Sequence, residues 1–348
     1  MSETKTDIWK FRLENIKDSG KADEIMKLYR AATAANAEWT TWDDEYPRLE
    51  FCLSDIENGE LFALCDESGS ILGAVTLKDT EEELDPLPFR INGKLGNAEI
   101  SRAAVSPDFA CHGIAGVMLG ECEKEAAARG YSCVRLLAAE KNIPARRVYM
   151  RAGYTEAGGC DIYGNPYVAY EKAVRKIETE RLYLREMTYS DCGALYAVLA
   201  DSDIMRHYPY TFDEVRVKNW IAKNIERYRT FGFGLWAVCL ADTGEMIGDC
   251  GITMQVMNGV IRPEIGYHIR RDKQRMGCAS EAARACRDFI FRETPFGEVY
   301  SYMMTDNVPS SSVAVKIGMR LRGKYSTDDG EVSYYSVSRR DMLLSDRA

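Results

Sequence analysis

The chain lacks the residues and segments that mark several protein classes. It has only 3 histidines, and its 11 cysteines show no paired Cys-x-x-Cys spacing, so we expect no metal site. No apolar run approaches the ~20 residues that a membrane helix needs, and residues 1–7 lack the basic and apolar regions of a signal peptide. An odd number of scattered cysteines fits reduced thiols, so we expect a cytoplasmic protein without a membrane partner.

Positive charge is in the minority. The 45 Lys and Arg residues stand against 54 Asp and Glu residues, and the resulting formal net charge of −9 argues against nucleic acid as the main partner. This charge is compatible with a cationic substrate, but acidic proteins are common. With 348 residues, of which 46% are hydrophobic, the chain is long enough to form two ordinary domains with real cores.

The sequence does contain a two-part motif that occurs twice. Residues 105–119 and 268–282 each follow an apolar, strand-like run, pass through a glycine-bearing turn and open a long helix. A second motif follows in each half, at 142–154 and 307–319. It consists of Asn at a strand end, Pro in the first turn of a short helix and Gly where that helix ends. Packing explains one such turn equally well, but it does not readily explain two linked motifs that are both repeated.

The turn in each copy has the chemistry of an anion site. The first backbone N–H groups of a helix have no partner within the helix, and the helix dipole adds positive charge there. In the first copy, the small residues Gly113, Ala115 and Gly116 let a diphosphate approach the backbone.

Both halves resemble the GCN5-related N-acetyltransferase (GNAT) superfamily. Its acyl-CoA signature is Arg/Gln-x-x-Gly-x-Gly/Ala, followed by Asn in a later helix and often by Tyr seven residues on. Residues 274–279 (Gln-Arg-Met-Gly-Cys-Ala) fit the signature in full, and residues 110–115 fit it except that Ala110 replaces the usual Arg or Gln. The second half is also similar to the ribosomal-protein N-terminal acetyltransferase branch, through Arg-Leu-x-Leu-Arg, Glu-Ile-Gly-Tyr and Asn-x-x-Ser.

This resemblance implies an α+β fold in each half. Each domain is expected to contain a mixed, mostly antiparallel sheet, splayed at its centre and flanked by helices. Residues 172–179 are charged and show no strong periodicity, so we place the boundary there and expect domains at 1–175 and 176–348. Two such domains can pack as a pseudo-dimer within a monomer, and a homodimer is the alternative.

The resemblance also implies acetyl-CoA as co-substrate, held between the splayed strands. A bulge in the strand before each turn is expected to free backbone N–H groups for the thioester oxygen. By pattern, the second half is the better CoA binder. The residues assigned to the cofactor are Val105, His112, Gly113, Ile114, Ala115, Gly116, Asn142 and Tyr149 in the first half, and Ile269, Gln274, Arg275, Met276, Gly277, Cys278, Ala279, Asn307 and Ser310 in the second.

Transfer to a primary amine, on a small molecule or a peptide, needs a base because a protonated amine has no lone pair. In the first half the resemblance assigns this role to Glu99. It assigns proton donation to the leaving sulfur to Tyr149, seven residues after Asn142. The alternative is that Glu99 is simply solvated and Tyr149 only packs.

The second half departs from this pattern. Ala314 stands where the Tyr donor is expected, so Ser310 is the candidate to bind the cofactor or donate a proton. Glu264 is the candidate base, but counting back from the turn puts it one residue out of step with Glu99. One residue of slip reverses the face of a strand, so the two glutamates are equivalent only if a bulge differs. His268 is the alternative base, although a lone histidine is more often structural.

The polar and aromatic stretch 38–47 has two interpretations. In this superfamily the region between the first two helices borders the acceptor pocket, so Trp39, Trp42 and Tyr46 would wall a substrate, with three acidic residues, Asp43, Asp44 and Glu45, attracting an amine. It is equally consistent with a surface loop pinned by its aromatic side chains.

Two functions therefore stay open. The first is an N-acetyltransferase that moves an acetyl group from acetyl-CoA to a primary amine by direct attack. In the second, one or both domains are non-catalytic modules that bind acyl-CoA or another ligand and have a regulatory or pseudo-dimer scaffolding role.

Overall fold

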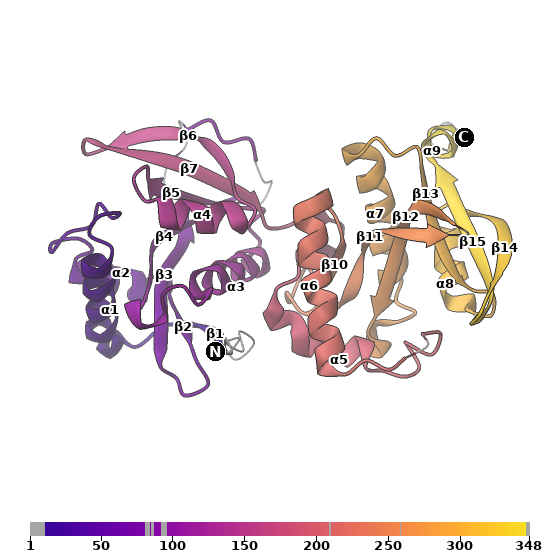
Figure 1. The fold of residues 1–348 in the computed structure, drawn as a ribbon, viewed down its shortest axis with the longest axis horizontal. Helices are drawn as coiled ribbons and strands as arrows, with labels where there is room; N and C mark the ends of the chain where they lie inside the picture. The colour runs from indigo at the N-terminus through magenta and orange to yellow at the C-terminus, as the bar shows by residue number, and fades with distance from the viewer. Residues whose placement is uncertain are drawn as a thin grey trace. The chain divides into compact units, whose positions relative to one another are not determined.

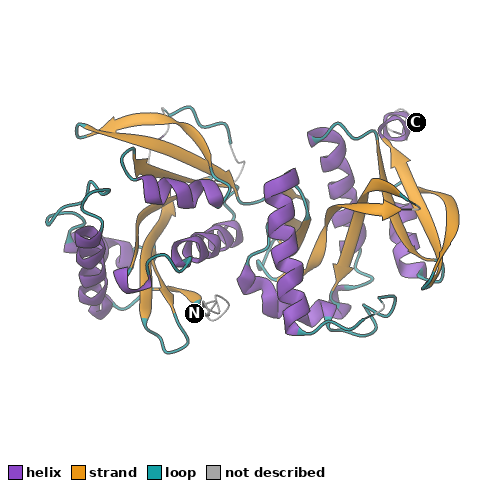
Figure 2. Cartoon of the chain, in the orientation of Figure 1, coloured by secondary structure: helices purple, strands orange, loops and turns teal. Residues whose placement is uncertain are grey.

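The computed structural model describes residues 11–80, 84, 87–91, 96–208, 210–257 and 259–345. Packing divides the chain into two units, Met1–Val174 and Arg175–Ala348. Each unit is built around one mixed, mostly antiparallel sheet with helices on its faces (Figures 1 and 2). The α+β class expected from the sequence is confirmed in both halves.

In the N-terminal unit the strand order is β1-β2-β3-β4-β5-β7-β6. The helices α1 and α2 lie on one face of this sheet and α3 on the other (Figure 1). The elements are β1 (Arg12–Asn15), α1 (Ala22–Ala35), α2 (Leu49–Glu57), β2 (Leu61–Cys65), β3 (Ile71–Asp79), β4 (Asn97–Val105), η4 (Pro107–Phe109), α3 (Ile114–Arg129), β5 (Cys133–Ala139), α4 (Ile143–Arg151), β6 (Thr155–Ile162) and β7 (Asn165–Ala173).

The centre of this sheet opens where two parallel strands separate. β4 pairs with β5 only from Asn97 to Ile100, and the rest of β4 has no pairing with β5. On its other side, β4 continues to pair with the antiparallel strand β3 as far as Val105. The splay expected from the sequence is therefore present.

β4 also carries the expected bulge. Its pairing with β3 shifts between Ala74↔Ala104 and Thr76↔Ser101, so β4 contains one more residue than β3 over this interval. Arg102, within the bulge, has a positive φ of 46°, which is uncommon for a non-glycine residue.

A buried ion pair holds the bulge residue. The Arg102 guanidinium donates to both carboxylate oxygens of Asp55 on α2, at 2.9 and 2.7 Å. Thr76 on β3 donates to the same carboxylate at 2.6 Å. Because all three groups are satisfied by one another, α2 is tied to the part of β4 that leaves the regular ladder.

In the C-terminal unit the strand order is β14-β15-β13-β12-β11-β10-β9-β8. Among its strands and α-helices, the short β8 and the final helix α9 were not expected from the sequence. The elements are β8 (Ile177–Glu178), β9 (Leu182–Arg185), η5 (Tyr189–Asp191), α5 (Cys192–Leu199), α6 (Glu214–Phe231), β10 (Leu235–Leu240), β11 (Met246–Met257), β12 (Val260–Ile269), η6 (Arg271–Lys273), α7 (Cys278–Glu293), β13 (Glu298–Met304), α8 (Val308–Lys316), β14 (Arg320–Thr327), β15 (Gly330–Ser338) and α9 (Arg339–Ser345).

The splay of this second sheet is wider. The parallel strands β12 and β13 share a single pairing, Glu264↔Tyr300. β11 and β12 pair without a shift from Gly248↔Ile269 to the hairpin end, so the expectation of a bulge here is wrong. Gly248 helps to keep the ladder regular, because a Cβ built on it would lie 2.0 Å from the His268 carbonyl oxygen.

Helices cover both faces of this sheet as well. Asp249 and Cys250 are adjacent on β11 and therefore point to opposite faces. Asp249 accepts a hydrogen bond from Trp220 on α6, at 2.8 Å, and Cys250 contacts Cys286 on α7, with 3.6 Å between the sulfurs. The sheet thus has an α6 face and an α7 face.

Most of the expected elements lie within a few residues of their observed bounds. The largest differences are in two hairpins. The sequence indicated a strand at 154–157, and β6 reaches Ile162; it indicated strands at 246–253 and 263–269, and β11 and β12 extend to Met257 and from Val260. The alternation of residues 8–13 predicts a first strand there, and the structure has it at Arg12–Asn15. Residues 8–10 lie outside the described residues.

Candidate active sites

The two turns predicted to hold a diphosphate have the same backbone conformation. Cys111 and Arg275 have φ values of 65° and 60°, and Gly113 and Gly277 have φ values of 80° and 87°. Glycine adopts this conformation without the steric cost that other residues incur. The match shows that the shape of the turn does not depend on the Ala110 difference.

The helices that follow the turns begin without a side-chain cap. Gly113 is the N-cap of α3 and Gly277 is the N-cap of α7, and neither helix start has a side-chain cap hydrogen bond. The first regular helical bonds reach Val117, at 3.2 Å, and Glu281, at 3.0 Å. The preceding amides, at 114–116 and 278–280, therefore form two donor sets at the positive ends of their helices.

The next pair of helices is capped. The side-chain oxygen of Asn142 accepts from the Ala145 amide at 3.1 Å, and that of Asn307 accepts from the Ser310 amide at 3.2 Å. The oxygen of each asparagine, which the sequence pattern assigned to the cofactor, therefore holds the first turn of α4 or α8.

Side chains of the turns point back to their own backbone. The Gln274 amide donates to the Ile269 carbonyl at 2.8 Å, and His112 Nδ1 lies 2.8 Å from the Ala110 carbonyl oxygen. Gln274 therefore closes its turn across the strand end, a contact that Ala110 cannot make.

Arg181 lies at the mouth of the second turn and was not identified as a site residue from the sequence. Its guanidinium donates to the Met276 carbonyl at 2.9 Å and to Glu281 on α7 at 2.8 Å. A Cβ built on Gly277 would lie 3.2 Å from Arg181 Nη2. The Arg-Leu-x-Leu-Arg motif was the available signal, but only tertiary folding brings its first arginine to this turn.

The two candidate bases occupy the same rung of their sheets. Glu99 pairs with Arg135 on β5, and Glu264 pairs with Tyr300 on β13, in both cases across the parallel strands that splay. From the sequence count, the two glutamates are equivalent only if a bulge differs between the strands, and this condition is met. The bulge at Arg102 adds one residue to β4 between the glutamate and the turn, and β12 has no such bulge.

Both glutamates therefore point toward the first helix pair of their unit. In the N-terminal sheet this is the face on which Thr76 reaches Asp55 of α2. In the C-terminal sheet it is the face on which Asp249 meets α6.

The surroundings of the two carboxylates differ. Glu99 is 9% exposed. On the strands beside it, the Arg135 guanidinium stacks 4.2 Å from the Phe89 ring, and Glu171 accepts from the Arg90 and Ile91 amides at 2.9 and 3.0 Å. Residues 89–91 thus cover this part of the N-terminal sheet.

Glu264 is half-buried and accepts a hydrogen bond from Thr253, at 3.0 Å. Burial raises the pKa of Glu264 to about 7, although Thr253 and the positive charges of His268 and Arg227 oppose the shift. A carboxylate with this pKa is suited to accept a proton near neutral pH.

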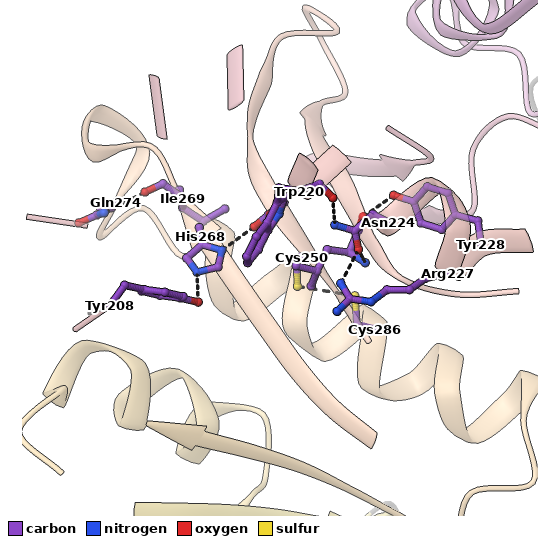
Figure 3. Close-up of polar contacts among 12 residues, drawn as sticks. Tyr208, Trp220, Asn224, Arg227, Tyr228, Cys250, His268, Ile269, Gln274 and Cys286 are labelled. Carbon is purple, nitrogen blue, oxygen red and sulfur yellow. Dashed lines mark hydrogen bonds and ion pairs between the residues drawn. The ribbon is translucent and has the colours of Figure 1, made fainter. Parts of the chain in front are cut away.

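His268 is held in a series of hydrogen bonds, and Figure 3 shows the one that joins it to Tyr208. Its Nδ1 is 2.7 Å from Asp249, which is fully buried, and its Nε2 is 3.0 Å from the hydroxyl of Tyr208. The second oxygen of Asp249 accepts from the Trp220 indole at 2.8 Å. Burial lowers the pKa of His268, but Asp249 and Glu264 outweigh it, so the pKa is raised overall.

The candidate sulfur donors also differ. Tyr149 lies with its ring centroid 6.1 Å from Tyr154 and 5.7 Å from Tyr170, and burial raises the pKa of Tyr149 to about 12. Its counterpart in the second unit, Ala314, is fully buried. Ser310 is half-buried on α8, and its backbone carbonyl accepts from Tyr267 at 2.7 Å.

The aromatic loop of the first unit is firmly held. Arg30 on α1 donates to the carbonyls of Asp43, Tyr46 and Pro47 at 2.8–3.2 Å. Trp42 packs edge-on to Tyr29, with ring centroids 5.6 Å apart. This agrees with a loop pinned by its aromatics, and the exposed acidic side chains Asp43, Asp44 and Glu45 leave its predicted role at the acceptor pocket open.

Several further features bear on the kind of site. Over the described ranges, no group of three or more His, Cys, Asp and Glu side chains is arranged to hold a metal ion. None of the helices in the described part of the chain is long and apolar enough to span a bilayer. One surface depression, lined by Asn15, Lys17 and Gly59 among others, contains none of the predicted site residues.

Comparison with known proteins gives matches in both halves. The family model described as the Acetyltransferase (GNAT) family matches residues 23–154, and the Acetyltransferase (GNAT) domain model matches residues 181–320. The uncharacterized protein YkkB of Bacillus subtilis (strain 168) is 36% identical over 148 residues, covering 42% of this chain and 86% of YkkB. The uncharacterized N-acetyltransferase YnaD of the same strain is 32% identical over 148 residues, covering 42% of this chain and 84% of YnaD.

A solved acetyltransferase of the GNAT family from Bacillus anthracis is 26% identical in sequence, with a TM-score of 0.42, and the match covers 47% of this chain and 98% of that one. Two α+β units with splayed sheets and glycine turns define the class, a tandem arrangement of acetyltransferase domains. The chain belongs to the GNAT acetyltransferase family, with one domain of the family in each half.

Proposed function

We propose that this protein is an acetyl-CoA-dependent N-acetyltransferase that acetylates a primary amine by direct attack. One transferase domain lies in residues 1–175 and one in 176–348, and the reaction takes place in the cytoplasm. One arrangement supports the proposal, and it occurs in both domains. Backbone amides without a side-chain cap follow Gly113 and Gly277, and Glu99 and Glu264 lie at the same position and on the same face of the splayed strands.

The donor sets fit a diphosphate ester. Backbone N–H groups at the start of α3 and α7 hold negative charge without a counter-ion of their own. In the second domain Arg181, which is paired with Glu281, donates to the Met276 carbonyl at the same mouth, and Gln274 fixes the turn. Acetyl-CoA supplies an activated acyl group, and the protein supplies position and proton transfer.

The proton-transfer roles follow from position and acidity. Glu99 and Glu264 take a proton from the acceptor nitrogen, with His268 as the alternative in the second domain. Tyr149 protonates the departing sulfur in the first domain, and Ser310 does so in the second. In the N-terminal domain the amides freed at the β4 bulge stabilise the charge that develops on the thioester oxygen.

Acetyl-CoA titration by calorimetry tests the binding half of the proposal. A stoichiometry near two supports two working sites, and a stoichiometry near one identifies a degenerate domain. If the purified chain does not bind acetyl-CoA at all, the proposal is wrong.

Release of free thiol with a panel of small amines and peptides tests turnover. Tyr149→Phe removes the phenol with little change of shape, and we expect it to lower kcat for first-domain substrates by about tenfold or more. Two bound equivalents without thiol release would instead support the alternative, in which the domains are acyl-CoA-binding modules without catalysis.

A further inference from the structure

The C-terminal domain contains a series of three side chains, of which the proposed chemistry uses only His268, and that one only as an alternative base. Tyr208, in the segment between α5 and α6, is joined to His268 on β12 at 3.0 Å (Figure 3), and His268 is joined to Asp249 on β11 at 2.7 Å. Asp249 is fully buried, and only 11% of the His268 side chain is exposed. Burying a carboxylate and an imidazole together is costly unless their hydrogen bonds are made, and here they are made.

The hydrogen bonds fix the tautomer of His268. A carboxylate cannot donate, so the proton between Asp249 and Nδ1 belongs to the imidazole. In the neutral ring Nε2 is then an acceptor, and the Tyr208 hydroxyl donates to it. Trp220 donates to the other oxygen of Asp249 at 2.8 Å and holds the carboxylate in place.

Tyr208, at one end of the series, interacts electrostatically with the candidate base Glu264. Glu264 and His268 are four residues apart on the same face of β12, with Gly266 on that face between them. A Cβ built on Gly266 would lie 3.7 Å from Glu264 Oε2, so the carboxylate leans over the glycine. Tyr208 reaches this face from a segment outside the sheet, and its ring lies 6.1 Å from Tyr210 and 6.0 Å from Phe212.

N-acetylation of an ammonium ion requires two deprotonations of nitrogen. The first frees the lone pair for attack, and the second converts the newly bonded nitrogen to a neutral amide. One carboxylate cannot hold both protons, so a second acceptor near Glu264 has a chemical role.

We propose that Tyr208, His268 and Asp249 form a proton relay that accepts the second proton in the C-terminal domain. This rests on the proposed function. Glu264 takes the ammonium proton, and as the C–N bond forms the C–S bond breaks. The nitrogen passes its second proton to the Tyr208 oxygen while Tyr208 passes its own proton to His268 Nε2. Ser310 protonates the sulfur and regains a proton from water.

His268 and Asp249 have distinct parts in this relay. The imidazolium formed on His268 lies against the Asp249 carboxylate and releases its proton to water before the next cycle. Asp249 acts only through His268 and is a positioning residue. The charged groups that act on the imidazole are Asp249 on β11 and Glu264 on β12, and Tyr208 is hydrogen-bonded to it. Arg227 on α6 acts in turn on Asp249 and Glu264.

Imidazole nitrogen NMR on the full chain tests the geometry without turnover. The sequence has only 3 histidines, so His268→Gln assigns the signal. We expect the neutral Nδ1–H tautomer for His268, and we expect Asp249→Asn to reverse the tautomer and lower the pKa of His268. A neutral Nε2–H tautomer in the unaltered protein overturns the relay.

Thiol release tests the catalytic part. The amines used are those that the Gly113→Val protein still acetylates, because this variant alters the turn of the first domain and leaves the second domain unchanged. Tyr208→Phe and His268→Gln are each expected to lower kcat by about 100-fold with little change in KM for acetyl-CoA. Asp249→Asn should lower kcat and move the acid limb of the pH profile to lower pH. Tyr210→Phe is the matched control, since Tyr210 lies in the same aromatic group, and it should retain its rate.

The outcomes separate this inference from the proposed function. If the unaltered protein acetylates such an amine and Tyr208→Phe or His268→Gln keeps the rate, the relay is wrong and the proposed function stands. If acetyl-CoA binds but no amine releases thiol through the C-terminal domain, catalysis there and the relay both fail. Acetyl-CoA titration of each variant confirms that the domain is folded.

Discussion

The N-terminal and C-terminal domains share a framework and differ at the point where chemistry is expected. Both have the same turn, the same uncapped helix start and a glutamate on the same rung. In the first domain, a bulge at Arg102 is tied to α2 and the glutamate is buried next to Arg135. In the second, the strand is regular and the half-buried glutamate is next to Tyr300.

Whether two residues of the two sheets are equivalent depends on strand register and not on the number of residues between each of them and its turn. Because β4 contains one inserted residue, Glu99 is one residue farther from its turn than Glu264 is from its own. The two side chains nevertheless point to corresponding faces of their sheets. The bulge absorbs the extra residue locally, so the alternation of faces is restored on its far side.

The largest expected effect concerns the two glutamates. Glu264→Gln should lower kcat/KM of the second domain by about 10²–10⁴-fold, because it removes the proton acceptor. In the unaltered domain the rate should rise with pH through about 7, as Glu264 loses its proton. Thiol release across a pH series measures both effects, and Glu99→Gln gives the corresponding loss in the first domain.

Stability serves as the control for Glu264→Gln. The pKa of Glu264 in the folded domain is about 7, above the value of about 4.3 for an unfolded chain. Its ionisation therefore destabilises the fold as pH rises between these values. The Gln variant should lose activity without a lower Tm at pH 8, and a lower Tm would point to a structural cause.

The next largest effect is expected on the stability of each domain, when a buried ion pair of that domain is broken. Arg185 and Asp191 meet at 2.8 Å in the second domain, with side chains 5% and 2% exposed, and Lys172 and Glu123 meet at 2.6 Å in the first. Asp191→Asn leaves a buried guanidinium without its counter-charge and should cost about 3–5 kcal/mol. Hydrogen exchange should show the loss in residues 175–348, and Glu123→Gln should show it in 1–174.

A smaller effect is expected from the glycines of the two turns. Valine at a positive φ costs about 1–3 kcal/mol, which corresponds to roughly 5- to 150-fold in affinity if the turn must be held for binding. Gly113→Val and Gly277→Val should each remove one equivalent of tight acetyl-CoA binding by calorimetry. Gly244→Val is a matched control, because Gly244 has a φ of 71° and lies outside both turns. If the protein that carries both Gly113→Val and Gly277→Val still binds two equivalents of acetyl-CoA, the assignment is wrong.

The smallest effect tests the one signature position at which the domains differ. Ala110→Gln should let the side chain close the first turn as Gln274 closes the second, by a bond to the strand-end carbonyl. One hydrogen bond contributes about 0.5–1.5 kcal/mol, so acetyl-CoA affinity of the first domain should rise up to about tenfold. Gln274→Ala should produce the opposite change in the second domain. If neither variant changes the acetyl-CoA affinity of its domain, this residue has no role.

The local signals were sufficient for the turns and helices. Gly113 and Gly277, followed by amphipathic segments, predicted the two helix starts, and Asn-x-Pro predicted α4 and α8. These features depend on residues close together in the chain, because a positive φ and a helix cap are properties of a few consecutive residues. They required no knowledge of the remote packing.

Other features needed contacts between distant parts of the chain. The bulge at Arg102 has its partner in Asp55, 47 residues earlier, and Arg181 lies against Glu281, 100 residues later. His268 appeared in the sequence as a lone histidine, and only the folded β11, α6 and the 201–212 segment supply Asp249, Trp220 and Tyr208 around it.

The sequence by itself determined that this protein has two copies of one fold, because repeated hydrophobic periods and glycine turns specify local backbone shape. Tertiary structure alone decided which face each glutamate occupies and which groups surround it. The physical reason is that strand register and burial depend on pairings between segments far apart in the chain. A shift of one residue, or a partner across the sheet, changes the acidity and access of a side chain whose own sequence neighbours are unchanged.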